Sequence, residues 1–226
     1  MLITGASTGI GAATARHAVE AGWRVALAAR SEDKLAELVA DLGEEHAFAQ
    51  RCDVTEFSDQ EALVAAAIER FGQVDAAFAN AGFGAARGFL KEDPDAWRSM
   101  ILTNVLGVAY TIRAVLPHFQ QRREGHFLLT SSVAGRRSLP GSLYSATKWA
   151  VTGMGESLRQ EVRQDEGSQV RVTLIEPGMV DTPFFDNRPT AALEADDIAR
   201  IVMFVLSQPP RVDINEVLVR PTSQAG

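Results

Sequence analysis

Short apolar runs alternate with longer amphipathic stretches along the whole chain. Each run is bounded by turn residues, which is typical of strands that are buried on both faces of a sheet. The stretches between the runs carry apolar residues at helical spacing, as Leu35, Leu38 and Leu42 do. The runs predict strands at residues 2–3, 24–28, 47–50, 74–79, 126–130, 170–175 and 216–219. The stretches predict helices at residues 11–21, 32–42, 58–71, 95–119, 142–164 and 194–207, with Ser58 as an N-cap.

This alternation predicts the fold class. We expect an α/β fold with a single Rossmann-like, doubly wound parallel sheet of about seven strands and helices on both faces. The sequence contains no linker, repeat or low-complexity segment, so residues 1–226 are expected to form one domain. The least regular stretch, about residues 177–193, is expected to be a substrate-binding loop. The first strand is short for a central strand, and the chain either begins late or has its start codon upstream.

Composition narrows the class of partner. The chain has 226 residues and a net charge of −7, which argues against nucleic acid or an anionic membrane as its main partner. Its one cysteine, Cys52, excludes an internal disulfide and favours a reducing compartment. No apolar run approaches the roughly 18 residues of a membrane span, and the N-terminus does not resemble a signal peptide. We therefore expect a cytoplasmic protein that binds neither membrane nor nucleic acid, and we predict no metal site.

A glycine-rich loop, TGASTGIG at 4–11, follows the first strand and opens a helix. Glycines let a backbone approach a pyrophosphate, and a helix N-terminus offers free N–H groups with a partial positive charge. The spacing is G-x-x-x-G-x-G rather than the G-x-G-x-x-G dinucleotide fingerprint. A plain glycine-rich turn is the alternative. The absence of a Gly-Lys-Ser/Thr sequence argues against a nucleoside-triphosphate loop.

The end of the second strand bears on the choice of cofactor. An NAD enzyme places an acidic residue there for the ribose 2′-hydroxyl. This chain has Ala28, Ala29, Arg30 and Ser31 instead. Arg30 can hold a 2′-phosphate through charge-assisted hydrogen bonds, which favours NADP(H) over NAD(H). A surface arginine without such a role is the alternative.

Tyr144 and Lys148 are the main candidates for proton chemistry. An i,i+4 pair shares one helix face. A free tyrosine has a pKa of about 10, and an ammonium about 4 Å away contributes roughly 4 kcal/mol toward the phenolate at an effective dielectric constant near 20. We therefore expect Lys148 to lower the pKa of Tyr144. An ordinary surface pair is the alternative.

Other polar residues follow predicted strands or interrupt helices. Ser131 and Ser132 end a strand just before Tyr144, where a hydroxyl can hold a substrate oxygen. Asn104 lies inside a predicted helix, where asparagine is a poor former and a local polar role would explain it. Residues 80–82 end another strand at the carboxyl edge, where ligands bind in such sheets. Simple packing or turn roles are the alternatives.

Taken together and in this order, the motifs resemble the short-chain dehydrogenase/reductase family over essentially the whole chain. The matching pieces are TGASTGIG (4–11), DV (53–54), NAG (80–82), NVLG (104–107), SSVAG (131–135), YSATK (144–148) and PGMVDT (177–182). The resemblance implies an oxidoreductase that moves a hydride between NADP(H) and a small carbonyl or secondary alcohol. It also implies a homodimer or homotetramer, in which 95–119 and 142–164 pack against their copies.

The same resemblance implies roles for single residues. Tyr144 would be the general acid in reduction and the base in oxidation, and Lys148 would lower its pKa and hold the nicotinamide ribose. Ser132 would bind the substrate oxygen, and Asn104 would keep a water in the proton relay. The implied cofactor-binding residues are Gly5, Ser7, Thr8, Gly9, Ile10 and Gly11 at the pyrophosphate, Arg30 and Ser31 at the 2′-phosphate, Asp53 and Val54 at the adenine, Asn80, Ala81 and Gly82 at the adenine ribose, Tyr144 and Lys148, and Pro177, Gly178, Val180 and Thr182 at the nicotinamide.

The chain departs from the family pattern in three places, one of which is the short first strand. Ser131 has the spacing to Tyr144 that members usually show, whereas the SSxxG motif selects Ser132, so Ser131 stays the second candidate. The segment after Thr182 is short, which implies an open pocket or one shaped by a partner subunit. The tail at 214–222 resembles bacterial members that act on 3-hydroxy acids and serine, but it is too short to fix a substrate.

Two sets of side chains border the expected substrate pocket. Leu139, Met179, Phe184 and Phe185 would form an apolar wall, with simple core packing as the alternative. Arg136 and Arg137 can meet a substrate carboxylate, although solvated loop charges are the favoured interpretation.

Two other functions remain open. A cofactor-binding sensor or scaffold of the same fold would be catalytically idle. Another Rossmann-like enzyme, such as a methyltransferase or a sugar-nucleotide epimerase, would bind a different ligand, since one fold hosts many functions.

Overall fold

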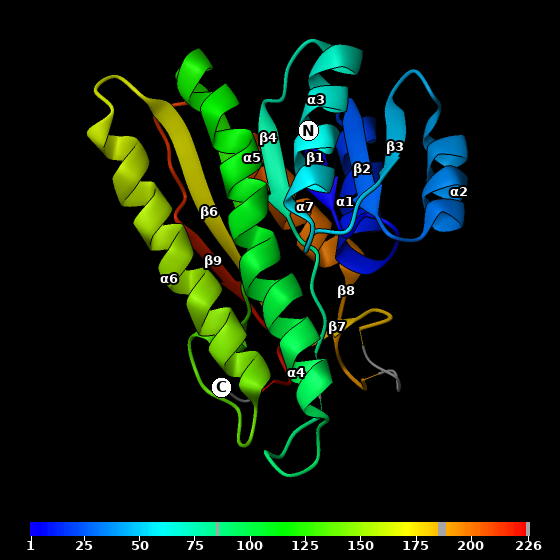
Figure 1. The fold of residues 1–226 in the computed structure, drawn as a ribbon, viewed down its shortest axis with the longest axis vertical. Coiled ribbons are helices and arrows are strands. Elements are labelled where there is room, and N and C mark those ends of the chain that lie inside the picture. The colour runs from blue at the N-terminus through cyan, green and yellow to red at the C-terminus, as the bar shows by residue number, and fades with distance from the viewer. Residues whose placement is uncertain (85, 185–188, 225–226) are drawn as a thin grey trace.

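The computed structural model describes residues 1–84, 86–184 and 189–224 and confirms the predicted fold class (Figure 1). Seven parallel strands form one sheet in the order β3-β2-β1-β4-β5-β6-β9. Its strands are β1 (Leu2–Thr4), β2 (Val25–Ala29), β3 (Ala47–Arg51), β4 (Ala76–Ala79), β5 (Glu124–Thr130), β6 (Gln169–Pro177) and β9 (Glu216–Val219). The order reverses direction between β1 and β4, and ligands bind at such a switch point in open α/β sheets.

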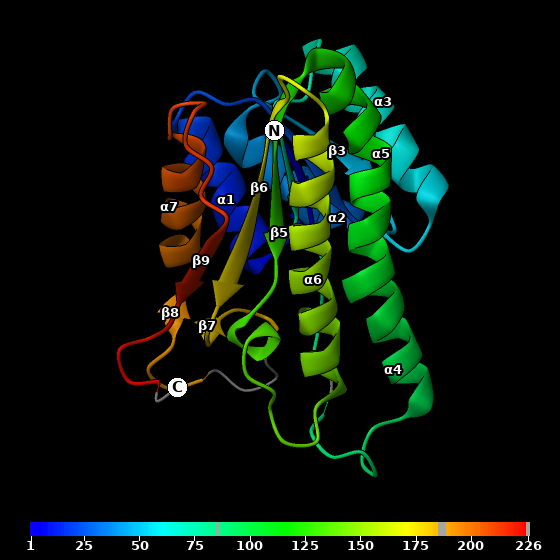
Figure 2. The same cartoon turned by 90° about the vertical axis from the view of Figure 1, so that its left-hand side faces the viewer.

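Helices cover both faces of this sheet (Figure 2). One buried apolar cluster contains side chains of α1, α2 and α7, and the other contains side chains of α3, α5 and α6. The bounds are α1 (Gly9–Glu20), α2 (Glu32–Leu42), α3 (Phe57–Phe71), α4 (Pro94–Ile101), α5 (Gly107–Arg122), α6 (Leu143–Gln164) and α7 (Ala195–Leu206). The sheet is therefore the middle layer of a doubly wound fold.

The pleat of the central strands divides their side chains between the two clusters. In β5, Phe127 and Leu129 face the α5 and α6 side, whereas Leu128 faces the α1 and α7 side. All three are fully buried. Because burial of one such side chain stabilises the fold by about 1.5–3 kcal/mol, a continuous apolar run is what a strand covered on both faces requires.

The long helix predicted at 95–119 consists of three parts. Between α4 and α5, the segment η1 (Leu102–Leu106) is a π-helix. A π-helix inserts one extra residue per turn and is common at functional sites. The prediction of one uniform helix was therefore wrong in this respect, and the deviation centres on Asn104, the residue that the sequence had marked as out of place.

The same segment bears on the expectation about membrane spans. Pro94–Arg122 is long and apolar enough, by length and composition, to cross a membrane, with a mean hydropathy of 1.5 in one 18-residue window. Its apolar residues are interrupted by Asn104 and two threonines, Thr103 and Thr111, so no continuous run reveals it. About a third of that window, 33%, is buried. Length and composition do not distinguish such a helix from a core helix, and α5 packs against α3, α6 and the sheet.

Smaller differences concern element ends and one extra pair of strands. Glu56, rather than Ser58, is the N-cap of α3, which begins at Phe57. A two-stranded parallel sheet, which the sequence did not predict, joins β7 (Val180–Asp181) to β8 (Leu193–Glu194). This pair closes the base of the predicted substrate-binding loop. The sequence pattern missed it because two-residue strands have no periodicity to detect.

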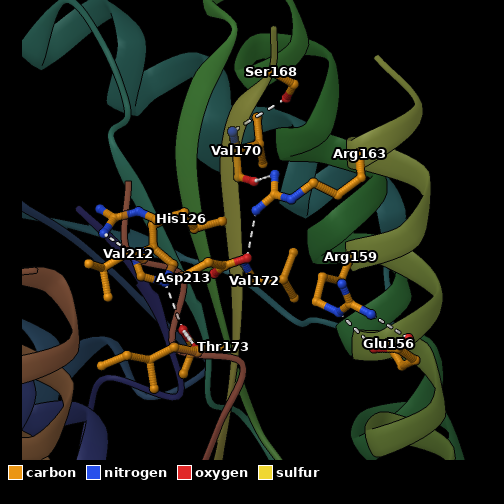
Figure 3. Close-up of polar contacts among 12 residues, drawn as sticks. His126, Glu156, Arg159, Arg163, Ser168, Val170, Val172, Thr173, Val212 and Asp213 are labelled. Carbon is orange, nitrogen blue, oxygen red and sulfur yellow. Dashed lines mark hydrogen bonds and ion pairs between the residues drawn. The ribbon is translucent and has the colours of Figure 1, made fainter. Parts of the chain in front are cut away.

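His126 is a buried histidine near the start of β5 (Figure 3). Its Nε2 lies 2.8 Å from Thr173 Oγ1, and the Thr173 hydroxyl donates to the carbonyl of Ile214. His126 Nε2 therefore donates to that oxygen, while Nδ1 has no partner among the described residues. Burial, and secondly the nearby Arg171, lower the pKa of His126 to about 3.

This burial predicts a loss of stability in acid. The unfolded chain protonates His126 below its ordinary pKa of about 6.5, whereas the folded chain does so only near pH 3, so the stability falls as the pH drops through this window. Between pH 7.5 and pH 5.5 the wild type should lose about 1.4 kcal/mol more than His126→Gln in urea unfolding. His46→Gln, at an exposed histidine, should behave as the wild type. Equal pH dependence in wild type and His126→Gln would contradict this account.

Candidate active site

The parallel register brings the candidate residues to one edge of the sheet. Strands β1, β4, β5 and β6 all end at this edge, and Figure 2 shows β5, β6 and β9 pointing toward it. Gly5 follows β1, Asn80 follows β4, Ser131 follows β5, and Pro177 ends β6. Residues that are far apart in the sequence therefore meet at the carboxyl ends of the strands.

Tyr144 lies in the first turn of α6, above this edge. Ser142 caps the helix by accepting a hydrogen bond from the N–H of Ser145, which fixes where α6 begins. The side chain of Tyr144 forms a hydrogen bond with Ser132. Lys148, one turn further along α6, places its Nζ 5.6 Å from the centroid of the Tyr144 ring. Tyr144 and Lys148 therefore share one helix face, as predicted, and this face is directed toward Ser132.

Lys148 is buried against the end of β5. Its side chain enters the edge of the sheet, and Nζ donates a 2.8 Å hydrogen bond to the carbonyl of Thr130. Burial lowers the pKa of Lys148 to about 8. The ammonium is therefore the main form at neutral pH, although it is held in a place with little water.

The expected acidification of Tyr144 does not occur in this structure. Burial raises the pKa of Tyr144 to about 12, and the hydrogen bond with Ser132 opposes this shift without overcoming it. The attraction of the Lys148 ammonium, on which the expectation rested, is smaller than the effect of removing a phenolate from water. Tyr144 is thus a neutral phenol that carries a proton at physiological pH.

Asn104 is fully buried in the π-helix and is bound at both ends of its amide. Its Oδ1 accepts from the N–H of Phe83 at 3.0 Å, and its Nδ2 donates to the carbonyl of Phe83 at 2.9 Å and to Thr147 Oγ1 at 3.2 Å. A Cβ at Gly82 would lie 3.1 Å from Asn104 Oδ1 and 3.7 Å from Lys148 Nζ. Asn104 therefore joins the segment after β4 to α6 beside the lysine.

The two candidate serines face different surroundings. Ser132 Oγ donates to the carbonyl of Pro177 at 3.3 Å and accepts from the N–H of Ala134, next to the Tyr144 phenol. Ser131 Oγ donates to the carbonyl of Lys148 at 3.0 Å and contacts Thr152 Oγ1 at 2.8 Å. The geometry therefore places Ser132, and not Ser131, beside the phenol.

The glycine-rich loop folds as a close-packed turn against the segment after β4. Gly5 has φ +65°, and a Cβ on Gly11 would lie 2.3 Å from the carbonyl oxygen of Gly5, so neither position admits a side chain. Asn80 Nδ2 donates to the carbonyls of Thr4 and Gly5, each at 3.3 Å. Ala81 packs on Gly5 from the same side. The loop that includes Ser7, Thr8, Gly9 and Ile10 is thereby fixed at the start of α1.

Arg30, Ser31, Asp53 and Val54 lie at the ends of β2 and β3. Arg30 and Ser31 are exposed, and no hydrogen bond or ion pair engages the Arg30 guanidinium within the described parts of the chain. Burial acts to raise the pKa of Asp53, but the hydrogen bonds from Thr55 and the charges of Arg30 and Arg51 together lower it. Val54 is buried, with its carbonyl bound by Gln60. Arg30 therefore supplies a free positive charge close to the adenine side of the predicted site.

The segment from Pro177 to Thr182 closes the other side. The N–H of Gly178 donates to the carbonyl of Val219, and Val180 is buried within β7. A Cβ at Gly9 would lie 3.1 Å from the Thr182 side chain, so this segment touches the glycine-rich loop. The predicted pyrophosphate and nicotinamide residues thus form one continuous rim.

These features fit a dinucleotide. The N-cap of α1, Thr8, makes no side-chain capping hydrogen bond, and the first turn of α1 has no acidic residue, so its N–H groups suit an anion. Tyr144 borders the same rim, because its ring packs on Phe184 and its hydrogen-bond partner Ser132 contacts Pro177. No group of three or more His, Cys, Asp and Glu side chains in the described segments is placed to hold a metal ion.

The residues expected to border the substrate have mixed outcomes. Phe184 packs edge-on against Tyr144, with ring centroids 5.6 Å apart, and lies against Gly84. Leu139 and Met179 are partly buried. Their backbone N–H groups donate to Ser145 Oγ and Gln224 Oε1, respectively. Phe185 lies outside the described residues. Arg136 is neither a solvated charge nor free for a substrate carboxylate, because its guanidinium is ion-paired with Glu176 and Glu216.

Sequence reasoning missed three threonines that build the site. Thr4 Oγ1 accepts from the N–H groups of Asn80 and Ala81, Thr130 supplies the carbonyl that holds Lys148, and Thr147 binds Asn104. Thr4 and Thr130 each end a buried strand, and a hydroxyl at that position is the signal that could have marked them.

Comparison with known proteins agrees with this geometry. The profile of the family described as short chain dehydrogenase matches residues 1–192. An uncharacterised oxidoreductase of Listeria monocytogenes is 42% identical, with the match covering 99% of this chain and 96% of that protein. The alcohol dehydrogenase of the archaeon Thermococcus sibiricus, solved with 5-hydroxy-NADP, has a TM-score of 0.91 at 32% identity, covering 100% of this chain and 97% of the other.

Two further solved structures differ in their cofactors. The closed form of a serine dehydrogenase complexed with NADP+ has a TM-score of 0.91 at 30% identity, covering 100% of this chain and 96% of the other. A short chain dehydrogenase/reductase from Burkholderia phymatum, solved with NAD, has a TM-score of 0.87 at 28% identity, covering 96% and 87%.

The fold, the polar cluster and these matches define the class of protein as an oxidoreductase that uses a nicotinamide cofactor and acts on a small substrate. The chain belongs to the short-chain dehydrogenase/reductase family.

The buried amide of Asn104 generates a stability prediction. Asn104→Ala should lower the free energy of unfolding by about 2–4 kcal/mol, because the N–H and carbonyl of Phe83 and the Thr147 hydroxyl each lose a partner. Urea unfolding measures this loss. Ser99→Ala, which removes an exposed hydrogen bond to the carbonyl of Asp95, is the control and should change stability by less than about 0.5 kcal/mol. Similar values for the two variants would contradict a special role for Asn104 in the fold.

Proposed function

We propose that this protein is an NADP(H)-dependent oxidoreductase that interconverts a small carbonyl compound and its secondary alcohol, with Tyr144 as general acid and base. The observation that carries the proposal is the convergence of Asn104, Ser132, Tyr144 and Lys148 at the carboxyl ends of β4 and β5, beside the glycine-rich loop. A sensor or scaffold has no need for this polar cluster.

Proton transfer in the proposed reaction belongs to Tyr144. Because burial keeps its phenol neutral, Tyr144 can donate a proton to the oxygen of a carbonyl substrate. Ser132, beside the phenol, would hold that oxygen by a hydrogen bond. When bound, the reduced nicotinamide supplies the hydride that adds to the carbonyl carbon, so that the products are the alcohol and the oxidised cofactor. In the reverse direction the Tyr144 phenolate accepts the proton of the alcohol.

Lys148 and Asn104 support this step. Once Tyr144 has given up its proton, the Lys148 ammonium one helical turn away stabilises the phenolate by electrostatic attraction. Asn104 borders Gly82 close to Lys148 Nζ, and by family resemblance it keeps a water in the relay that returns the proton. Lys148 is also proposed to hold the nicotinamide ribose.

The preference for NADP(H) rests on Arg30. β2 ends without the acidic residue that would accept the ribose 2′-hydroxyl of NAD, and the free Arg30 guanidinium suits a 2′-phosphate. The solved relatives include members with NADP and one with NAD, so the family itself does not decide between them. Gly5 to Gly11, Asp53, Val54, residues 80–82 and 177–182 are proposed to hold the rest of the cofactor.

The assembly and its location are part of the proposal. Exposed apolar side chains along the α4 and α6 surfaces, Ile101 and Trp149, suit contact with a second copy, as in a homodimer or homotetramer. The free, buried thiol of Cys52 suits a reducing compartment such as the cytoplasm. We propose that residues 1–226 act as one domain in this assembly.

Removing one hydroxyl tests the catalytic proposal. Tyr144→Phe should lower kcat for NADPH-dependent carbonyl reduction by about 10²–10⁴-fold, because the proton donor is lost. A panel of small aldehydes and ketones, followed by NADPH absorbance, measures the effect. Tyr110→Phe is the matched control, since the chain has only two tyrosines and the Tyr110 ring packs on Phe57 away from the cluster. Full turnover by Tyr144→Phe would refute the role, and tight NADPH binding by the wild type without any turnover would favour the sensor.

Removing one charge tests the choice of cofactor. Arg30→Ala should weaken NADPH binding by about 10–100-fold, the value of a charge-assisted contact, and leave NADH binding within about threefold. Arg16→Ala is the control, since Arg16 is an exposed arginine that pairs with Asp41 on α2. Fluorescence titration gives both dissociation constants. Equal losses for the two cofactors would show that Arg30 does not read the 2′-phosphate.

A further inference from the structure

An ion pair with a buried carboxylate lies close in the chain to both partners of the Ser132–Pro177 hydrogen bond. Glu176 near the end of β6 is 1% exposed, and Arg136 Nε donates to its two carboxylate oxygens at 2.8 and 3.0 Å. Arg136 also pairs with Glu216 of β9. Burial raises the pKa of Glu176, and the Arg136 guanidinium opposes this shift. Such a pair gives little net stability, because the desolvation of the two charges offsets most of their attraction. Its main effect is therefore to fix the positions of the segments that it connects.

Both members lie next to residues of the active site. Arg136 follows the short turn η2 (Val133–Gly135), which Ser132 caps with its side chain. Glu176 precedes Pro177, whose carbonyl accepts the hydrogen bond of Ser132 Oγ. The ion pair therefore connects the turn that follows Ser132 to the residue that precedes Pro177, and so holds both partners of the Ser132–Pro177 hydrogen bond in place.

Two hydroxyl groups join the pair to α6. Thr152 Oγ1, on α6, lies 3.4 Å from a carboxylate oxygen of Glu176 and 2.8 Å from Ser131 Oγ, and Ser131 Oγ donates to the carbonyl of Lys148 at 3.0 Å. A Cβ on Gly135 would lie between 2.5 and 2.8 Å from Ser131 Oγ, the Lys148 carbonyl and Thr152 Oγ1. This packing leaves no space for residues 131–135 to shift relative to Lys148.

We propose that Arg136 and Glu176 are positioning residues that fix Ser132 relative to Tyr144 and Lys148. The inference rests on the proposed function, since it assigns the pair to the same site. The pair contacts none of the residues proposed for the pyrophosphate or the 2′-phosphate, which lie at the ends of β1 and β2. It should therefore affect turnover far more than cofactor affinity.

The experiment compares this pair with a matched pair at the opposite edge. Arg163 of α6 donates to Asp213, just before β9, at 2.6 Å, and Figure 3 shows this contact. The Arg163–Asp213 pair also involves the region of β9, but it lies far from the carboxyl ends of the strands. The variants are Glu176→Gln, the double variant Arg136→Met with Glu176→Gln, and the controls Asp213→Asn and Arg163→Met with Asp213→Asn. Each is measured for kcat, the Kd of NADPH, urea unfolding, and amide exchange in 131–137.

Glu176→Gln should lower kcat at least tenfold and leave the Kd of NADPH within threefold. Glu176→Gln leaves Arg136 Nε without its carboxylate partner, and the double variant also removes this guanidinium. It should therefore regain most of the lost stability, while its kcat stays within threefold of that of Glu176→Gln. Both should exchange at least tenfold faster in 131–137. The control variants should change none of these except stability. The proposal is overturned if kcat recovers together with stability in the double variant, or if Asp213→Asn lowers kcat equally.

Failure of the proposed function would look different. If the wild type reduces no carbonyl in the panel, the amide exchange of 131–137 still decides the inference. Faster exchange in both Glu176 variants and not in the controls supports the positioning role, and unchanged exchange refutes it.

Discussion

The parallel alignment of β1, β4, β5 and β6 is the constraint on which the site depends. Parallel strands end together, so residues that follow them meet at one edge without any contact in sequence. Asn80, Ser132 and Pro177 come from segments about fifty residues apart along the chain, yet they line one rim. Direct hydrogen bonds between these segments, such as that of Thr130 with Asn80, turn the shared edge into a fixed arrangement.

The electrostatic character of the site follows from burial. Lys148 is buried and Tyr144 is partly buried, and burial raises the pKa of Tyr144 and lowers that of Lys148, so the neutral form of each is favoured. A protonated phenol beside an ammonium group is suited to giving up its proton when negative charge develops on a nearby oxygen. The site is thus prepared for charge that appears during the reaction rather than for charge that is present at rest.

Much of this architecture could be predicted from the sequence. Apolar runs such as 126–130 identified the strands because double burial removes polar residues from them, and the motifs that end those strands identified the candidate residues. The features that differ from the sequence predictions depend on contacts between residues far apart in the chain. The π-helix at Leu102–Leu106 and the β7–β8 pair arise from tertiary contacts that no local period records. The direction of the Tyr144 pKa shift depends on how much water the fold removes, and the partners of Arg136 lie forty and eighty residues away in the sequence.

The π-helix also bears on how this segment can change. A π-turn accommodates one residue more than an α-turn, so deleting one residue between 102 and 106 would give a regular helix and leave the apolar side of α5 on the sheet. Asn104 would then lose the local geometry that directs its amide toward Phe83 and Thr147. The extra residue therefore serves the polar cluster and not the packing of the helix.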